Sequence, residues 1–577
     1  MVLKGLNFIA KLRERESSAD DLLLLSILAV VCGVISGLTM ILIVAGLRFF
    51  SGVLLPGHSE NYEGLDGWLP FVFPLVATSL LALIWFFLPT KWQKVGIPYV
   101  VERLNYHHGN LPMANGIVQL VGVFIGLLGG LSIGKEGPAV HIGATFGSQL
   151  AQRFRLTHIG IETLVACGVA GAIAAAFQTP IAGVLFAFEV IFLEYRLRHG
   201  IPVMLSAVVA VMLSEATLGS LDIFTVIHFD LAVPTHTLLP SLLVLVVGIV
   251  LATSMFYRLQ RLGWRLLGLP IWVRFTAVGL ATGLVAMFLP SVLGGGYDTL
   301  NRIFTQQAPD WLLLLIVAKI VLTGLSIGLG IPGGMIGPAF VIGGLVGMQV
   351  GLLFHGVLPD IAVYGLFPLL GMASMMAATF QAPLTALIAV LEMTHSSQAM
   401  LPSLVVITLS CLITRLVLHQ DSVFVERLHA MGMVSSWDPV QKLLRHSDLR
   451  SLCESVVQLP RLAPPERLRE INASMIDFVL IETLGQTSVT GREELLSVFE
   501  QWRLGPQPWL SNDDQEVQLD LAKMGSWQSV LVVPAPDTPA EALALMNRHH
   551  CDRLVLQFEQ GLGLVSRYQI DKLLLKD

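Results

Sequence analysis

The chain has 577 residues, of which 54% are hydrophobic and only 13% are Asp, Glu, Lys or Arg, and its formal net charge is −6. A soluble protein carries roughly 25% charged residues, so the charges here are too few to cover the surfaces of soluble domains. The composition excludes a soluble enzyme, a disordered protein and a nucleic-acid-binding protein, and predicts a polytopic membrane protein.

The N-terminal residues 1–21 carry Lys4, Lys11, Arg13 and Arg15, and an apolar run at 22–47 follows them. That run is longer than the apolar region of a signal peptide, roughly 7–15 residues, and we interpret it as the first membrane helix. Positive charges favour the cytoplasmic side of a membrane. Residues 1–21 are therefore predicted to form a cytoplasmic segment.

Further apolar segments continue to about residue 418, and Gly and Pro interrupt them repeatedly. Several are shorter than the roughly 20 residues that span a bilayer. Helices that stop inside a membrane must end in a cavity or against other protein segments, so a bundle of broken helices is predicted. The clearest segments are 68–88, 117–133, 201–212, 238–256, 275–289, 311–329, 340–354, 363–379 and 400–418.

Two blocks of the chain recur in the same order. Residues 134–147 and 334–347 are identical at seven of 14 aligned positions, with an offset of 200, and residues 177–189 match 380–392 with an offset of 203. The pattern indicates an internal duplication with halves at about 22–220 and 238–424. A duplicated bundle with interrupted helices places a transport site between its halves.

Glycine-proline helix starts suggest what that site binds. Pro138 and Pro338 each follow a glycine directly, and Pro98 comes two residues after Gly96. All three suit the first turn of a helix, where the missing N–H is not needed. The free N–H groups of such a turn carry partial positive charge and bind anions. Ordinary close-packed kinks of membrane helices are the alternative interpretation.

Glu136 stands alone among apolar neighbours, and the matching residue of the second half is Ile336. An ionisable side chain inside a membrane is costly and usually functional. Its carboxylate at a helix N-terminus could occupy an anion site and leave it when protonated, which makes Glu136 a candidate gate. A carboxylate that only caps the helix is the alternative.

These residues together resemble the CLC family of chloride channels and chloride/proton antiporters. The motifs are Gly134-Lys-Glu-Gly-Pro138, Gly96-Ile-Pro98, the run 330–338 and the blocks that end in Glu189 and Glu392. The resemblance covers about 22–427. It implies an all-α polytopic fold, built from two inverted repeats of broken, tilted helices, in a homodimer with one anion pathway per subunit.

The resemblance also implies roles for single residues. Glu136 matches the external gating glutamate of the family, and backbone amides at several helix starts face the anion. The anion-binding set that we expect is Val95, Gly96, Ile97, Pro98, Gly134, Lys135, Gly137, Met335, Ile336, Gly337 and Phe424. We expect no metal ion in the site.

Two positions depart from the family pattern at the central anion site. Val95 stands where the family has a serine, and Phe424 where it has a tyrosine. Both changes remove a hydroxyl donor, so the sequence predicts weaker anion binding there. Chloride remains the expected anion.

A third departure concerns the mechanism. Proton-coupled members usually carry an internal glutamate just after the position of Glu189, and here that residue is Val190. Valine cannot take up a proton, so the sequence favours a passive, gated chloride channel. The alternative is a chloride/proton antiporter, with Glu194 one helical turn further on as a substitute.

A membrane-embedded enzyme is a more distant alternative. It would need a nucleophile with a base, or a set of metal ligands, on facing helices. The pair His107-His108 has no third ligand at helical spacing, and no His-Glu-x-x-His motif occurs. We therefore expect no enzymatic activity.

Residues 428–577 regain charges and are predicted to form a cytoplasmic regulatory domain. The part 456–577 resembles a degenerate pair of CBS modules, and residues 529–569 suggest the order strand, helix, strand, strand, helix. Gln569 stands where nucleotide-binding modules place an acidic residue, so no nucleotide or other cofactor is expected. The expected location is the cell (inner) membrane, with both termini cytoplasmic. Expected partners are chloride, protons at Glu136, lipid and a second copy of the chain, but no nucleic acid.

Overall fold

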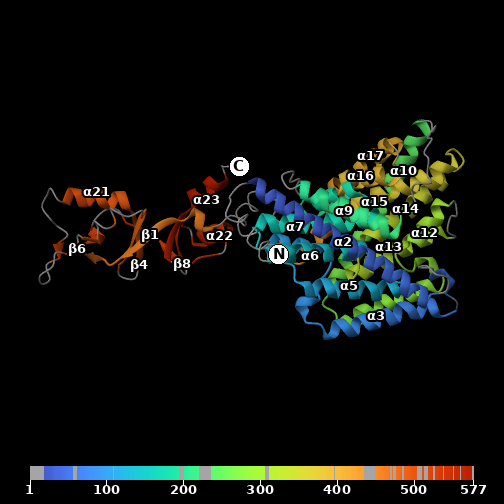
Figure 1. Cartoon of the computed structure of the whole chain (residues 1–577), viewed down its shortest axis with the longest axis horizontal. Helices are drawn as coiled ribbons and strands as arrows, with labels where there is room; N and C mark the ends of the chain where they lie inside the picture. Colours follow the sequence, from blue (N-terminus) through green and yellow to red (C-terminus); the bar gives the residue numbers. More distant parts are fainter. Residues whose placement is uncertain are drawn as a thin grey trace, which may run out of the picture. The chain divides into compact units, whose positions relative to one another are not determined.

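A computed structural model of the chain divides it into two compact units, residues 1–433 (unit 1) and 434–577 (unit 2). Each unit is described by itself (Figure 1). The expected border was 427/428. The structure describes residues 18–55, 62–65, 67–107, 109–193, 200–219, 235–305, 311–395, 397–433, 449–464, 466–467, 471, 476–483, 486–502, 510–511, 518–523, 527–536, 538–549, 551–558 and 561–574.

Unit 1 is helical throughout its described parts. Its first half contains α2 (Ser18–Leu54), α3 (Leu69–Phe87), α4 (Ile97–Tyr106), α5 (Met113–Leu128), α6 (Glu136–Arg153), α7 (His158–Phe177), α8 (Pro180–Phe186) and α9 (Gly200–Leu218). Its second half contains α10 (Thr235–Arg265), α11 (Ile271–Ala286), α12 (Tyr297–Phe304), α13 (Leu312–Gly328), α14 (Ile336–Leu353), α15 (Phe367–Phe380), α16 (Pro383–Thr394) and α17 (Met400–Leu412), followed by α18 (Val423–Ala430).

Short 3₁₀ or π-helical turns interrupt this helical order. They lie at Tyr62–Gly64, Thr90–Trp92, Ala187–Phe192, Pro290–Val292, Ala362–Leu366, Ser397–Ala399 and Ile413–Val417. Every apolar segment named from the sequence overlaps a helix or a helix plus such a turn, although 117–133 runs past the end of α5 at Leu128. The expected bundle of broken helices is therefore confirmed.

Helices of two lengths build unit 1. Among the described residues, eight helical segments are long and apolar enough to cross a membrane: Leu22–Leu54, Leu69–Phe87, Ile159–Phe177, Gly200–Leu218, Leu238–Arg265, Ile336–Leu353, Ala362–Phe380 and Met400–Val417. Shorter apolar helices lie between them, such as Leu312–Gly328 and Pro383–Thr394. These helices are shorter than the roughly 20 residues of a typical membrane-spanning helix.

The same close helix packing occurs in both halves. α6 packs on α7, and α14 packs on α15. A Cβ atom on Gly143 would lie 2.3 Å from the carbonyl oxygen of Gly168, and one on Gly343 would lie 2.3 Å from that of Gly371. Glycine at these positions lets the two backbones touch, as is usual where membrane helices pack. The duplicated sequence blocks therefore form two helix pairs that pack in the same way.

A reciprocal pair of carboxylates joins the two halves at α8 and α16. Glu189 accepts hydrogen bonds from the backbone N–H groups of Leu384 (3.1 Å) and Thr385 (2.8 Å) at the start of α16. Glu392, near the end of α16, accepts from the N–H groups of Ile181 and Ala182 at the start of α8, both at 2.8 Å. Each half therefore caps a helix of the other half, where a carboxylate is favourable.

Unit 2 is an α/β domain around a seven-stranded sheet with the order β7-β4-β3-β1-β10-β9-β8. Its strands are β1 (Glu454–Leu459), β3 (Phe478–Thr483), β4 (Gln486–Gly491), β7 (Gln528–Ser529), β8 (Leu531–Pro534), β9 (Arg553–Phe558) and β10 (Gly561–Ser566). A three-stranded sheet contains β2 (Leu462–Ala463), β5 (Leu510–Ser511) and β6 (Gln518–Asp520). The helices are α21 (Arg492–Trp502), α22 (Pro539–His549) and α23 (Arg567–Leu574), with 3₁₀ turns at Leu449–Leu452 and Leu521–Lys523.

The large sheet repeats one pattern of pairing. β1 runs parallel to β3, which runs antiparallel to β4; likewise β8 runs parallel to β9, which runs antiparallel to β10. β1 and β10 join the two sets, with Glu454 opposite Leu564. The predicted order of strand, helix, strand, strand, helix is confirmed for β8, α22, β9, β10 and α23. Whether these are CBS modules stays a prediction.

Candidate anion-binding site

Three helices of unit 1 begin at the same cavity. α4 begins at Ile97 after Gly96, which has a positive φ of 90°, and α6 and α14 begin at Glu136 and Ile336. Pro98 lies in the first turn of α4, where a proline costs no hydrogen bond. The N–H groups of a first turn have no partner within their own helix and carry partial positive charge. The three starts can therefore attract an anion without a full positive charge.

A short bridge between the two halves sets the positions of α6 and α14. The N–H of Gly134 donates to the carbonyl oxygen of Gly334 (2.6 Å), and the N–H of Gly334 donates to that of Gly134 (2.8 Å). The bridge is antiparallel. Because Gly134 and Gly334 are equivalent in the repeat, the pairing relates the two loops by a local twofold axis. This local relation is the one expected at the contact of two inverted halves.

The carboxylate of Glu136 lies at the N-terminus of the opposite repeat helix. Its Oε1 accepts a hydrogen bond from the hydroxyl of Tyr297 (2.6 Å), and its Oε2 accepts one from the backbone N–H of Gly337 in α14 (3.1 Å). The side chain is only 1% exposed. A carboxylate in this position takes donors that would otherwise be available to an anion.

A glycine-rich loop before α12 holds Tyr297 in place. The buried ammonium of Lys319, in α13, donates to the carbonyl oxygens of Gly294 (2.9 Å) and Leu293 (3.5 Å). The N–H of Gly294 donates to the carbonyl oxygen of Gly130 (2.8 Å) in the loop that leads to Glu136. Lys319 thus supports the loop that carries the hydroxyl donor of the gate.

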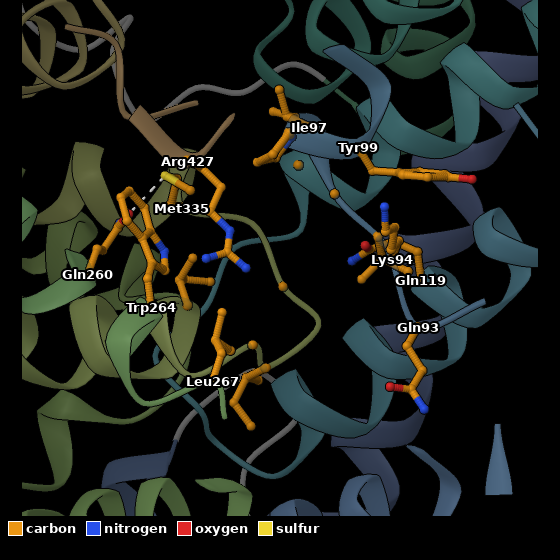
Figure 2. Close-up of a pocket in the computed structure, with 18 of the residues that line it drawn as sticks. Gln93, Lys94, Ile97, Tyr99, Gln119, Gln260, Trp264, Leu267, Met335 and Arg427 are labelled. Atoms are coloured by element: carbon orange, nitrogen blue, oxygen red, sulfur yellow. Dashed lines mark hydrogen bonds between the residues drawn. The ribbon is translucent and has the colours of Figure 1, made fainter. Parts of the chain in front are cut away.

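One cavity of about 290 Å³ lies where these helices begin; we call it the inner cavity. It is lined by the start of α4, near Ile97, and by the loop that leads to α14, near Met335 (Figure 2). Phe424 of α18 also lines it. Four charged side chains also line it: Lys94, Glu102, Arg274 and Arg427. Lys94 and Glu102 form an ion pair (2.8 Å).

The predicted anion-binding residues divide between the inner cavity and the bridge. Lining residues of the cavity are Val95, Gly96, Ile97, Pro98, Gly137, Met335 and Phe424. Gly134 and Gly337 bind other groups at the bridge, Ile336 is buried, and the ammonium of Lys135 lies 5.0 Å from the centre of the Tyr297 ring. The structure therefore brings the two groups of residues together around Gly137 and Gly334.

Two backbone groups that we expected to be free for an anion have partners. The N–H of Gly96 donates to Nδ1 of His141 (3.3 Å), and the N–H of Gly134 is used in the bridge. His141 is fully buried in α6, and the sequence analysis did not consider it. Its only signal in the sequence is an isolated imidazole in a small-residue helix.

Val190 lies in the π-helical turn Ala187–Phe192 and is only 1% exposed. The neighbouring carboxylate of Glu189 also accepts a hydrogen bond from the hydroxyl of Thr385 (2.7 Å) in addition to its backbone donors. Glu194, the suggested substitute, lies outside the described residues. Within the described part of this turn, Glu189 is therefore engaged in holding α16.

The sequence analysis missed Tyr297, Lys319 and the two arginines of the inner cavity. Lys319 had the same signal as Glu136, an isolated charge in an apolar helix. Tyr297 follows Gly294-Gly295-Gly296, a turn signal whose partner cannot be read from the sequence. Arg274 and Arg427 stand at the ends of helices, where a basic residue has many ordinary explanations.

One family model and several known proteins are similar to this chain in sequence. The family model described as "Voltage gated chloride channel" matches residues 75–415. The H(+)/Cl(−) exchange transporter ClcA of Vibrio cholerae is 30% identical over 397 residues, which are 64% of this chain and 81% of the relative. The voltage-gated ClC-type chloride channel ClcB of Escherichia coli is 34% identical over 330 residues, 55% of this chain and 76% of the relative.

A solved structure extends the similarity to most of the chain. The crystal structure of a eukaryotic CLC transporter matches with a TM-score of 0.59 and 20% identity. The match covers 95% of this chain and 98% of that chain. At this identity the match shows a shared fold.

Proposed function

This chain belongs to the voltage-gated chloride channel family, known as CLC, and from that premise we propose that it exchanges chloride for protons across the cell membrane. The relative from Vibrio cholerae, at 30% identity, is named as an H(+)/Cl(−) exchange transporter. The comparisons support exchange better than the passive channel that the sequence analysis favoured, so exchange becomes the first proposal.

The position of the Glu136 carboxylate is the observation that carries the proposal. It accepts the N–H of Gly337 at the start of α14, at a place suited to an anion. A chloride ion and an ionised carboxylate cannot occupy one small site together, because like charges in a low dielectric repel strongly. Protonation of Glu136 removes its charge and lets chloride enter. Such mutual exclusion links the movement of a proton to that of chloride.

A passive chloride channel is the second candidate, and Val190 favours it. Its buried aliphatic side chain replaces the carboxylate that would pass protons to the inner side. The relative from Escherichia coli, at 34% identity, is named as a voltage-gated chloride channel. Glu136 would then act as a protonatable gate without net proton transport.

The proposed assembly is a homodimer in the cell membrane, with both termini cytoplasmic. Apolar side chains are exposed on the helices that join the halves, such as Ile181 (55%) on α8 and Leu384 (45%) on α16. Either lipid or a second copy can cover such a surface. We propose that unit 2 is a cytoplasmic pair of CBS modules that packs and regulates without a nucleotide.

The test is the reversal potential of the purified chain in a lipid bilayer under a chloride gradient, with and without a pH gradient. Exchange predicts that the pH gradient shifts the reversal potential away from the chloride equilibrium potential. A reversal potential that stays at the chloride value in both conditions would establish the channel instead. Glu136→Gln is the matched control, because it keeps the size of the side chain but cannot exchange a proton.

A further inference from the structure

The inner cavity carries positive charge that its own residues do not balance. Of its charged side chains, Lys94 and Glu102 neutralise each other (2.8 Å). Arg274 and Arg427 also line the cavity, and within the described chain neither forms an ion pair with a carboxylate. Positive charge in a partly buried cavity attracts anions from solution.

The guanidinium of Arg427 lines the cavity and has few bonding partners in the described chain. It lies 5.4 Å from the centre of the Trp264 ring, and in the described chain it makes no hydrogen bond. The adjacent Glu426 does not compensate it, because its carboxylate pairs with Arg261 (2.7 Å). Figure 2 shows the guanidinium of Arg427 directed into the cavity beside Trp264. Burial and the nearby charge of Arg274 both lower the pKa of Arg427.

Arg274 is placed differently. Its guanidinium donates to the carbonyl oxygens of Leu269 (3.0 Å) and Leu329 (2.6 Å), which fix it at the edge of the cavity. A guanidinium has five N–H donors, so donors remain for a ligand. Two guanidinium groups on one cavity, one fixed and one stacked on an aromatic ring, form a site for an anionic group.

Buried amides in the same cavity also lack partners. Both polar atoms of the Gln119 side chain, and Oε1 of Gln260, have no hydrogen-bond partner in the described chain, and both side chains are fully buried. Both line the inner cavity. An unpartnered buried amide costs free energy unless a ligand or water satisfies it. These unpartnered amides are a second, independent observation that indicates a polar ligand in the cavity.

We propose that the inner cavity binds a small oxyanion, a carboxylate or phosphate group, between Arg427, Arg274 and the buried amides. The planar fork of a guanidinium matches two oxygen atoms of such a group, whereas a halide offers only one atom. The cavity, at about 290 Å³, is close to the smallest sites for small molecules, which are roughly 300–1,000 Å³. The aromatic wall at Trp264 accommodates an apolar part of an organic acid.

The consequence for transport rests on the proposed function. The bound oxyanion lies beside Phe424 and the start of α4, where chloride must pass. It therefore competes with chloride and slows chloride movement. The chain would then respond to the oxyanions of the compartment that the inner cavity faces.

Calorimetric titration of the full-length protein in detergent with inorganic phosphate tests the binding directly. We expect Arg427→Gln to weaken phosphate affinity about tenfold or more, since a charged hydrogen bond is lost. Arg427→Lys keeps the positive charge but loses the planar guanidinium that can bind two oxygen atoms. It should weaken phosphate affinity less than Arg427→Gln does. Arg261→Gln is the matched control, because Arg261 lies on α10 but is not among the residues that line the cavity. Equal affinities of the native chain and Arg427→Gln, or no binding by the native chain, would overturn the proposal.

Chloride efflux from vesicles of phosphatidylcholine tests the consequence, and the neutral lipid supplies no competing anionic headgroup. Phosphate on both faces should slow efflux through the native chain and through Arg261→Gln, but not through Arg427→Gln. Equal slowing of all three would refute the competition. If the native chain binds phosphate through Arg427 but moves no chloride, the proposed function fails while the oxyanion site stands.

Discussion

The gate depends on hydrogen bonds between residues far apart in the chain. Glu136 belongs to the first half of unit 1, whereas both donors to its carboxylate, Tyr297 and Gly337, belong to the second. Neither partner is visible in the sequence, because only the bridge between the halves brings them together. The sequence did predict that Glu136 lies at a helix start, since an isolated carboxylate beside glycine and proline is a local signal.

Replacement of the gate carboxylate should open the pathway. Glu136→Gln removes the charge that competes with chloride, so we expect larger chloride flux that depends little on pH. Flux is measured in vesicles across a range of pH. A variant whose flux keeps the pH dependence of the native chain would remove Glu136 from this role.

Loss of the tyrosine hydroxyl should weaken the closed position. Tyr297→Phe removes one of the two described hydrogen bonds to Glu136, and a hydrogen bond to a charged group contributes about 1.5–3 kcal/mol. We expect flux at neutral pH to rise by about tenfold or more. Tyr364→Phe, on the turn Ala362–Leu366, is the control, because the ring of Tyr364 lies against His355 (6.4 Å between ring centres). Unchanged flux in Tyr297→Phe would show that Gly337 alone holds the carboxylate.

Hydroxyl groups at the central site should strengthen chloride binding. Val95 and Phe424 line the inner cavity without a donor of their own side chains. Val95→Ser and Phe424→Tyr together add two donors, and we expect chloride affinity to increase about 30-fold if each contributes about 1 kcal/mol. Calorimetric chloride titration measures it. Tight binding by the native chain, equal to that of the double variant, would contradict the expectation.

Among the elements, α6 and α14 define the site because both begin at the glycine bridge. Their starts were predictable from Gly-Pro pairs, and the apolar segment 340–354 covered most of α14, whereas no named apolar segment covered α6. The pairing of Gly134 with Gly334 was not, since a repeat in sequence does not say how its copies meet. The capping of α16 by Glu189 and of α8 by Glu392 was hidden for the same reason.

A methyl group in the bridge should destabilise unit 1. A Cβ atom on Gly334 would lie 2.7 Å from the backbone nitrogen of Gly137, so Gly334→Ala forces the two helix starts apart. Overpacking of this kind costs about 1–3 kcal/mol. We expect a lower melting temperature in detergent. Gly200→Ala, where a Cβ would meet nothing within 4 Å, should leave it unchanged.

At the scale of the whole molecule, the change in composition near residue 420 indicated two domains, and the chain divides at 433/434. Sequence patterns predicted the order of strands and helices in 529–569, because apolar runs lie between turn residues there. The joining of two strand sets through β1 and β10 depends on contacts across more than a hundred residues, which no local pattern contains.

All residues of the gate and of the inner cavity belong to unit 1. A chain that ends at Met433 should therefore still move chloride, with the pH dependence of the full-length protein. Vesicle flux of both forms, after gel filtration confirms that each is folded, measures this. A folded but inactive truncated chain would show that unit 2 is required for transport.

The glycine bridge also limits how this gene can change. Gly134 and Gly334 are encoded 200 codons apart, yet a side chain on either one meets the backbone of the other half. Mutations in the two copies of the duplicated segment therefore cannot accumulate independently at these codons. The copies were free to diverge beside the bridge, where one half encodes Glu136 and the other Ile336. Both copies thus carry glycine where they touch, and only one copy carries the carboxylate of the gate.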